Sequence, residues 1–75
     1  MISIKEAIML LKQKFSRRTP VGYWRFDNAY VIKTKPIGVL KNLTAPALFV
    51  VTDDKKVYGT TPMEYDLDID KMIKL

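Results

Sequence analysis

Apolar residues in the first part of the chain recur at every third or fourth position, with charged residues between them. This spacing places them on one face of an α-helix. The apolar positions are Ile4, Ala7, Ile8, Leu11 and Phe15. Just before them, Ser3 and Glu6 have the spacing of a capping box, in which the serine hydroxyl accepts the amide three residues on. We therefore expect a helix over about residues 4–16, which ends before Pro20.

The pattern changes between Tyr23 and Lys35, where aromatic and β-branched residues predominate. Such residues favour strands. Asp27 and Asn28 interrupt the run and tolerate tight turns, so one interpretation is a hairpin with Trp24 opposite Val31 and Phe26 opposite Ala29. The other is one long strand with a bulge at Asp27, and both interpretations stay open.

A second hairpin is expected nearer the carboxyl end. Residues 47–52 form a continuous apolar run of strand length, which predicts a central strand covered on at least part of both faces. Residues 53–56 are charged turn formers, residues 57–60 return the chain, and Pro62 ends that strand. A short extended link should follow, and Asp66 or Asp68 should then cap a short final helix.

These elements predict one α+β domain over residues 1–75: an amino-terminal helix packed on a small antiparallel sheet of about four strands, with a short carboxyl-terminal helix. A chain of 75 residues has room for one core only. The residues expected to share that core are Ile8, Leu11, Phe15, Trp24, Val31, Leu48, Phe49 and Val50.

The connection from residue 36 to residue 46 has more apolar residues than a loop requires. They are Ile37, Val39, Leu40 and Leu43. One interpretation is that they form a protein-interaction surface, either for a protein partner or for a second copy in a homodimer, since a small sheet has two open edges. The other is that they fold under and close the core.

The absence of two residue types, cysteine and histidine, limits the classes of function that the sequence allows. The sequence has no cysteine, which excludes disulfides and favours a cytoplasmic protein, and it has no histidine. Without these side chains we predict a protein that is not an enzyme and that has no cofactor or metal. Asp66, Asp68 and Asp70 alternate as in the start of a calcium loop, but the required glycine is absent, so helix capping is favoured. No apolar run is long enough to cross a bilayer, and no membrane association is expected.

Charge is distributed unevenly along the chain. Residues 1–41 contain nine basic and two acidic side chains, whereas residues 42–75 contain four basic and six acidic ones. A basic patch with aromatic residues can bind nucleic acid through phosphate contacts and base stacking. The candidate residues for this alternative are Lys12, Lys14, Arg17, Arg18, Tyr23 and Arg25. Basic residues at a helix carboxyl end also stabilise the helix dipole, which favours a structural role.

Three segments and the expected closing helix carry a resemblance to a known family. The segments are residues 23–26 with an aromatic-x-aromatic pattern, residues 45–58 with a proline before an apolar strand and an acidic turn, and residues 60–62. Together they resemble the YrhB-like immunity-protein family of bacterial polymorphic toxin systems, and they are similar, as a second choice, to small PepSY-like domains. This resemblance implies a non-catalytic protein-binding or inhibitory module of bacterial or phage origin.

Overall fold

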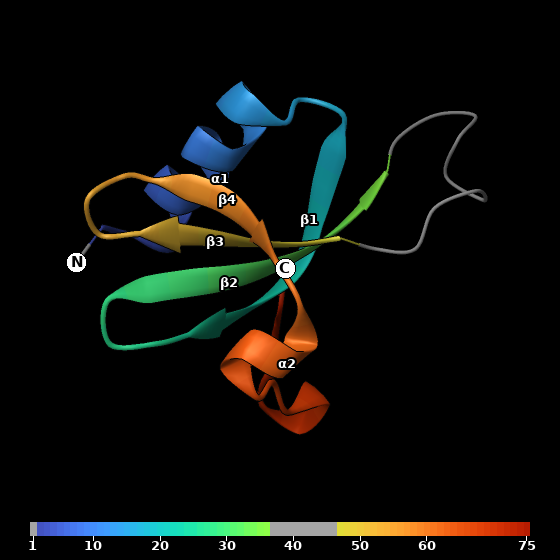
Figure 1. The fold of residues 1–75 in the computed structure, drawn as a ribbon. Coiled ribbons are helices and arrows are strands. Elements are labelled where there is room, and N and C mark those ends of the chain that lie inside the picture. Colours follow the sequence, from blue (N-terminus) through green and yellow to red (C-terminus); the bar gives the residue numbers. More distant parts are fainter. Residues whose placement is uncertain (1, 37–46) are drawn as a thin grey trace.

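The computed structural model describes residues 2–36 and 47–75. In these ranges the chain forms one α-helix, four strands of four to eight residues, a short helix, a 3-10 turn and a two-residue strand (Figure 1). The predicted α+β class is confirmed, with an amino-terminal helix on an antiparallel sheet and a short carboxyl-terminal helix. No helix within these two ranges has both the length and the apolar character needed to cross a membrane.

Helix α1, Ile4–Lys14, begins where the capping box predicts. The amide of Glu6 donates to the Ser3 hydroxyl at 3.1 Å, and Ala7 and Leu11 are buried against the sheet. The helix ends two residues earlier than expected, because Phe15 leaves the helical conformation and packs its ring on Phe49, with 4.4 Å between the ring centroids.

Among the described residues the sheet has five strands, where about four were expected. They are β1 (Arg18–Arg25), β2 (Ala29–Pro36), β3 (Leu48–Thr52), β4 (Val57–Thr60) and β5 (Ile73–Lys74). Their order is β4-β3-β2-β1-β5, and all neighbours are antiparallel. The extra strand is the end of the chain, which returns to pair with Gly22 and Tyr23.

The first hairpin has the predicted register. Trp24 lies opposite Val31, and the amide of Phe26 donates to the carbonyl of Ala29 at 2.9 Å, so the alternative of one long bent strand is wrong. Strand β1 begins at Arg18, however, and includes Pro20. A register shift between Pro20 and Gly22 accommodates the proline, which a strand tolerates only at a bulge or an open edge.

The buried residues form two clusters on opposite faces of the sheet, so the prediction of one shared core is wrong. The first cluster lies under α1 and contains Ala7, Leu11, Tyr30, Ile32, Phe49, Val51 and Val57. The second contains Trp24, Ala29, Val31 and Val50. The reason is the alternation of side chains along a strand, which sends Phe49 and Val51 to one face and Val50 to the other. Coverage of β3 on both faces was expected from its continuous apolar run.

Residues 61–75 cover the second face. Helix α2, Pro62–Tyr65, starts directly at Pro62, where an extended link was expected, since proline suits the first position of a helix. Asp66 ends it in a left-handed conformation, with φ of 48°. The predicted cap at Asp68 is confirmed: its carboxylate accepts the amide of Asp70 at 3.0 Å and starts the 3-10 turn η2, Ile69–Lys71. Figure 1 shows this segment and α1 on different sides of the sheet.

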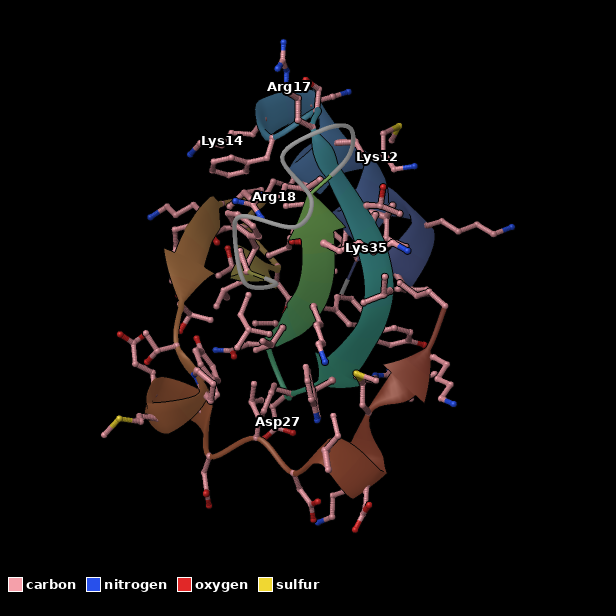
Figure 2. The ribbon with its side chains drawn as sticks, turned by 90° about the vertical axis from the view of Figure 1, so that its right-hand side faces the viewer. Lys12, Lys14, Arg17, Arg18, Asp27 and Lys35 are labelled. Atoms are coloured by element: carbon pink, nitrogen blue, oxygen red, sulfur yellow. The ribbon has the colours of Figure 1, made fainter. Side chains whose placement is uncertain are left out.

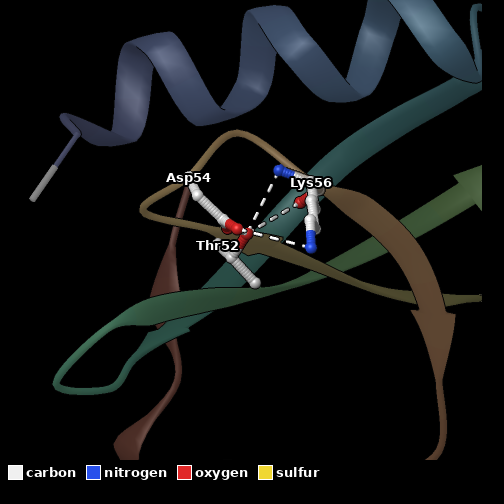
Figure 3. Close-up of polar contacts among 3 residues, drawn as sticks. All are labelled: Thr52, Asp54 and Lys56. Atoms are coloured by element: carbon white, nitrogen blue, oxygen red, sulfur yellow. Dashed lines mark hydrogen bonds and ion pairs between the residues drawn. The ribbon is translucent and has the colours of Figure 1, made fainter.

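The predicted turn over residues 53–56 joins β3 to β4. Within it the Thr52 hydroxyl donates to the Asp54 carboxylate and accepts the amide of Lys56 at 3.1 Å (Figure 3). The hydrogen bond from Thr52 is the main cause of a lowered pKa at Asp54, and the nearby Lys56 ammonium lowers this pKa further. Lys55 has φ of 68° and places its ammonium 3.8 Å from the Glu6 carboxylate on α1.

Candidate functional site

A groove of about 330 Å³ opens between the second face of the sheet and the carboxyl-terminal segment. We call it the Trp24 groove. It is lined by Trp24, Lys33, Leu48, Pro62, Leu67 and Ile69. Five of these six residues are uncharged, which makes the groove an apolar surface with a single cation. Concave, mostly apolar sites with one or a few polar groups are the usual form of binding sites in proteins.

The sheet supplies the floor of the groove. Leu48 of β3 lies opposite Lys33 of β2, and Trp24 of β1 lies opposite Val31 of β2. Trp24 is almost fully buried, and its indole nitrogen donates to the carbonyl of Asp68 at 2.8 Å. This hydrogen bond ties the carboxyl-terminal segment, which forms the other wall, to the sheet.

Apolar side chains at the outer wall of the groove are exposed to solvent. Ile69 lines the groove and is 60% exposed, and Met63, next to the lining residue Pro62, is 93% exposed. Tyr65, at the end of α2, packs its ring against Phe26, with 5.2 Å between the ring centroids. The Tyr58 hydroxyl lies 3.4 Å from the Tyr65 hydroxyl, and this hydrogen bond is the main cause of a raised pKa at Tyr65.

Among the described residues, Lys33 is the only charged one that lines the groove. It is half-buried, and the hydrogen bonds and ion pairs among residues 2–36 and 47–75 leave its ammonium without a partner. The Asp68 carboxylate, on the segment facing it, is already used to cap η2. The groove therefore has a cation that the described part of the chain does not neutralise.

A larger hollow, of about 700 Å³, lies between α1 and β4. Its lining includes Gln13, Lys14, Lys55 and Lys56, which are all exposed, so it is a wider and more polar depression than the Trp24 groove. We therefore consider the smaller, apolar Trp24 groove to be the better binding site.

Four of the six predicted nucleic-acid residues gather at one end of the molecule. Lys12, Lys14, Arg17 and Arg18 lie around the carboxyl end of α1 and the start of β1, and Lys35 of β2 joins them because it pairs with Thr19 (Figure 2). We call this group the basic end. The two ion pairs among the described residues, Lys55 with Glu6 and Lys56 with Asp54, involve none of the five.

Within the basic end, one side chain is hydrogen-bonded to the fold and another is partly buried. The ammonium of Lys14 donates to the carbonyl of Val57 at 2.9 Å. One terminal nitrogen of the Arg18 guanidinium is buried and has no hydrogen-bond partner among the described residues. Lys12, Arg17 and Lys35 are exposed.

The other two predicted nucleic-acid residues are not part of the basic end. The ring of Tyr23 packs edge-on against Tyr30, with 5.7 Å between the centroids, and belongs to the cluster under α1. Arg25 lies at the opposite end of β1, beside the turn at Asp27. The six residues therefore form no continuous surface, because Tyr23 packs into the cluster under α1 and β1 carries Arg25 to the end far from Arg18.

The predicted interaction residues Ile37, Val39, Leu40 and Leu43 lie outside the described residues. In the part of the chain that is described, no group of three or more acidic, cysteine or histidine side chains could hold a metal ion.

Sequence reasoning did not identify the Trp24 groove. A signal for it exists in residues 66–70, where Leu67 and Ile69 alternate with three aspartates. Leu67 and Ile69, the first residue of η2, both line the groove, so the apolar residues of this alternating run form its wall.

No model of a known protein family matches this chain, and neither a curated protein nor a solved structure was found that is similar to it. The function must therefore be argued from the geometry of the site itself.

Proposed function

We propose that this protein is a small non-catalytic protein-binding module, of the inhibitory or immunity type, and that its partner docks on the Trp24 groove. The observation that carries the proposal is the apolar groove together with the solvent-exposed side chains of Met63 and Ile69. A contiguous exposed apolar surface is the usual mark of an interaction site. Aromatic residues and methionine are also enriched in the centres of protein interfaces.

The sequence supports the same proposal. It contains neither histidine nor cysteine, the side chains most used for acid-base and nucleophilic catalysis. The resemblance of residues 23–26 and 45–58 to the YrhB-like immunity family also favours a binding function. A cytoplasmic location is part of the proposal and rests on the cysteine-free sequence.

Affinity purification from the native host, with quantitative identification of the co-eluting proteins, tests the proposal. The wild type is compared with Ile69→Asp, which places a carboxylate on the groove, and with Met9→Asp as a matched control. Met9 is similarly exposed, at 53%, but lies on α1. We expect a partner that is lost with Ile69→Asp and kept with Met9→Asp. No reproducible partner, or one lost with neither variant, would overturn the proposal.

A second candidate function is binding of nucleic acid at the basic end. It is favoured by one observation, the addition of Lys35 to Lys12, Arg17 and Arg18 at the same end of the molecule (Figure 2). Several phosphates could then be neutralised together, which makes affinity fall steeply with salt.

Binding of a labelled single-stranded oligonucleotide at increasing salt tests this second function. The double variant Arg17→Gln/Lys35→Gln should weaken binding and flatten its salt dependence, because fewer counterions are released. The control Lys55→Gln/Lys71→Gln removes the same charge elsewhere and should have a much smaller effect. Absence of binding at low salt would exclude this function.

A further inference from the structure

Lys33 occupies an unusual position on the second face of the sheet. Its two cross-strand neighbours are Leu48 in β3 and Gly22 in β1. The Met72 side chain occupies the space above Gly22, since a β-carbon at residue 22 would lie 2.5 Å from the Met72 sulfur. The Lys33 side chain therefore lies between apolar side chains and lines the Trp24 groove.

This environment favours an anion that comes from outside the chain. The Lys33 side chain is half-buried beside apolar residues, and its ammonium is the one charge among the described residues that a ligand in the groove would meet. Within the described ranges no carboxylate lies within 4.0 Å of it. A carboxylate brought into the groove would form a charge-assisted hydrogen bond in surroundings that screen it less than bulk water.

The size of the groove decides which carboxylate fits best. A volume of about 330 Å³ holds little more than one large residue, and the same cavity presents both the cation and the apolar wall of Leu67 and Ile69. One residue that carries both a charge and an apolar group can therefore contact both parts of the groove. The last residue of a peptide does so, because its free carboxylate and its side chain leave the same α-carbon.

We infer that the Trp24 groove binds the carboxyl-terminal residue of a partner protein, with a large apolar side chain against Trp24 and Leu67 and the terminal carboxylate on Lys33. This inference rests on the proposed function and names the feature of the partner that the groove recognises. Ile69, exposed at the edge of the groove, covers the side chain once it is seated.

A matched pair of small probes tests the charge. N-acetyl-phenylalanine has the terminal carboxylate, and N-acetyl-phenylalanine amide has the same side chain without the charge. Each is titrated into the protein to about 20 mM, which covers the millimolar affinity of ligands of this size, and the indole NH signal of Trp24 is followed by NMR. We expect the acid to bind about tenfold more tightly than the amide, because only the acid forms the ion pair.

Substitutions of Lys33 test the assigned contact. Lys33→Gln should lower the affinity for the acid to that for the amide, and Lys33→Arg should restore most of it. Lys35→Gln is the control, since it removes an equal charge two residues further along β2, where the side chain is exposed. The peptide N-acetyl-Asp-Phe-amide carries an internal carboxylate, and if it binds as tightly as the acid, recognition of a chain terminus is wrong.

The inference and the proposed function fail in different ways. Equal affinity for acid and amide, no binding of either, or no effect of Lys33→Gln would overturn the inference. The proposed function is overturned separately, when the captured partner does not depend on Ile69. A partner that is captured through Ile69 but keeps its affinity after amidation of its last residue would leave the protein-binding function in place and exclude terminal recognition.

Discussion

The two faces of the sheet carry apolar residues from the same strands but are covered by different kinds of element. Among the residues that the structure describes, an eleven-residue helix lies on one face, and seven residues are buried in the cluster there. On the other face a short helix, a 3-10 turn and a two-residue strand cover a cluster of four buried residues. A regular helix presents a continuous apolar stripe and closes its face. The irregular segment cannot do so, and it leaves the Trp24 groove.

On both faces of the sheet, a hydrogen bond from a buried aromatic side chain holds the covering segment in place. Under α1, the Tyr30 hydroxyl donates to the carbonyl of Ile2 at 3.0 Å. On the second face, the Trp24 indole donates to the carbonyl of Asp68. A buried aromatic residue thus ties each covering segment to the sheet, and the difference between the faces lies in the apolar packing. This comparison can be tested by substitution.

The largest effect is expected from Leu11→Ala. Leu11 is fully buried under α1, and its truncation should cost about 2 to 5 kcal/mol of the free energy of unfolding. The corresponding change on the second face, Leu67→Ala, removes a half-buried side chain and should cost about 1 kcal/mol. Denaturant melts of the two variants measure the difference, and equal costs would show that the second face is packed as tightly as the first.

A smaller effect is expected from Gly22→Ala. The new β-carbon would lie 2.5 Å from the Met72 sulfur, so Met72 must move away, and we expect a cost of about 1 to 3 kcal/mol. The control is Gly59→Ala in β4, where the nearest atom, the carbonyl oxygen of Leu48, is 4.0 Å from the new β-carbon. Adding Met72→Ala to Gly22→Ala should remove most of the extra cost, as expected for residues in contact.

Removal of the fastening hydrogen bonds should have a still smaller effect. Trp24→Phe deletes the bond to Asp68, and Tyr30→Phe deletes the bond to Ile2, each at a cost of about 1 kcal/mol. Amide hydrogen exchange should localise the change. Trp24→Phe should speed exchange at Lys71 and Met72, whose amides bond within the carboxyl-terminal segment, and leave the amides of α1 unchanged. Faster exchange in α1 would mean that the two faces are coupled.

The smallest effect is expected from acid titration of Asp54 in the turn before β4. Its lowered pKa means that the ionised form stabilises the folded state. This contribution is fully present above the ordinary value of 3.8 and is lost as the pH falls through the lowered pKa. Since the side chain is exposed, the effect is small. When the pH is lowered below 3.8, the melting temperature of Asp54→Asn should therefore fall less than that of the wild type. Melting temperatures that fall equally with pH in both proteins would contradict this stabilising role of Asp54.

What the sequence by itself determined are the features that depend on neighbouring residues. The cap at Ser3, the turn at Asp27 and Asn28, and the cap at Asp68 are such features. Each follows from contacts within a few residues of the chain, which a local pattern contains. The continuous apolar run in β3 likewise predicted that both faces would be covered.

Only the tertiary structure decided what covers the second face and where a site forms there. Trp24 and Asp68 are 44 residues apart, and no local pattern predicts their hydrogen bond. The same holds for Lys33, which becomes the cation of a groove only when the carboxyl-terminal segment returns to pair with β1. It also holds for Arg25, which β1 carries away from the basic end. Alternation assigns each strand residue to a face, but the element that packs there is selected by contacts between distant parts of the chain.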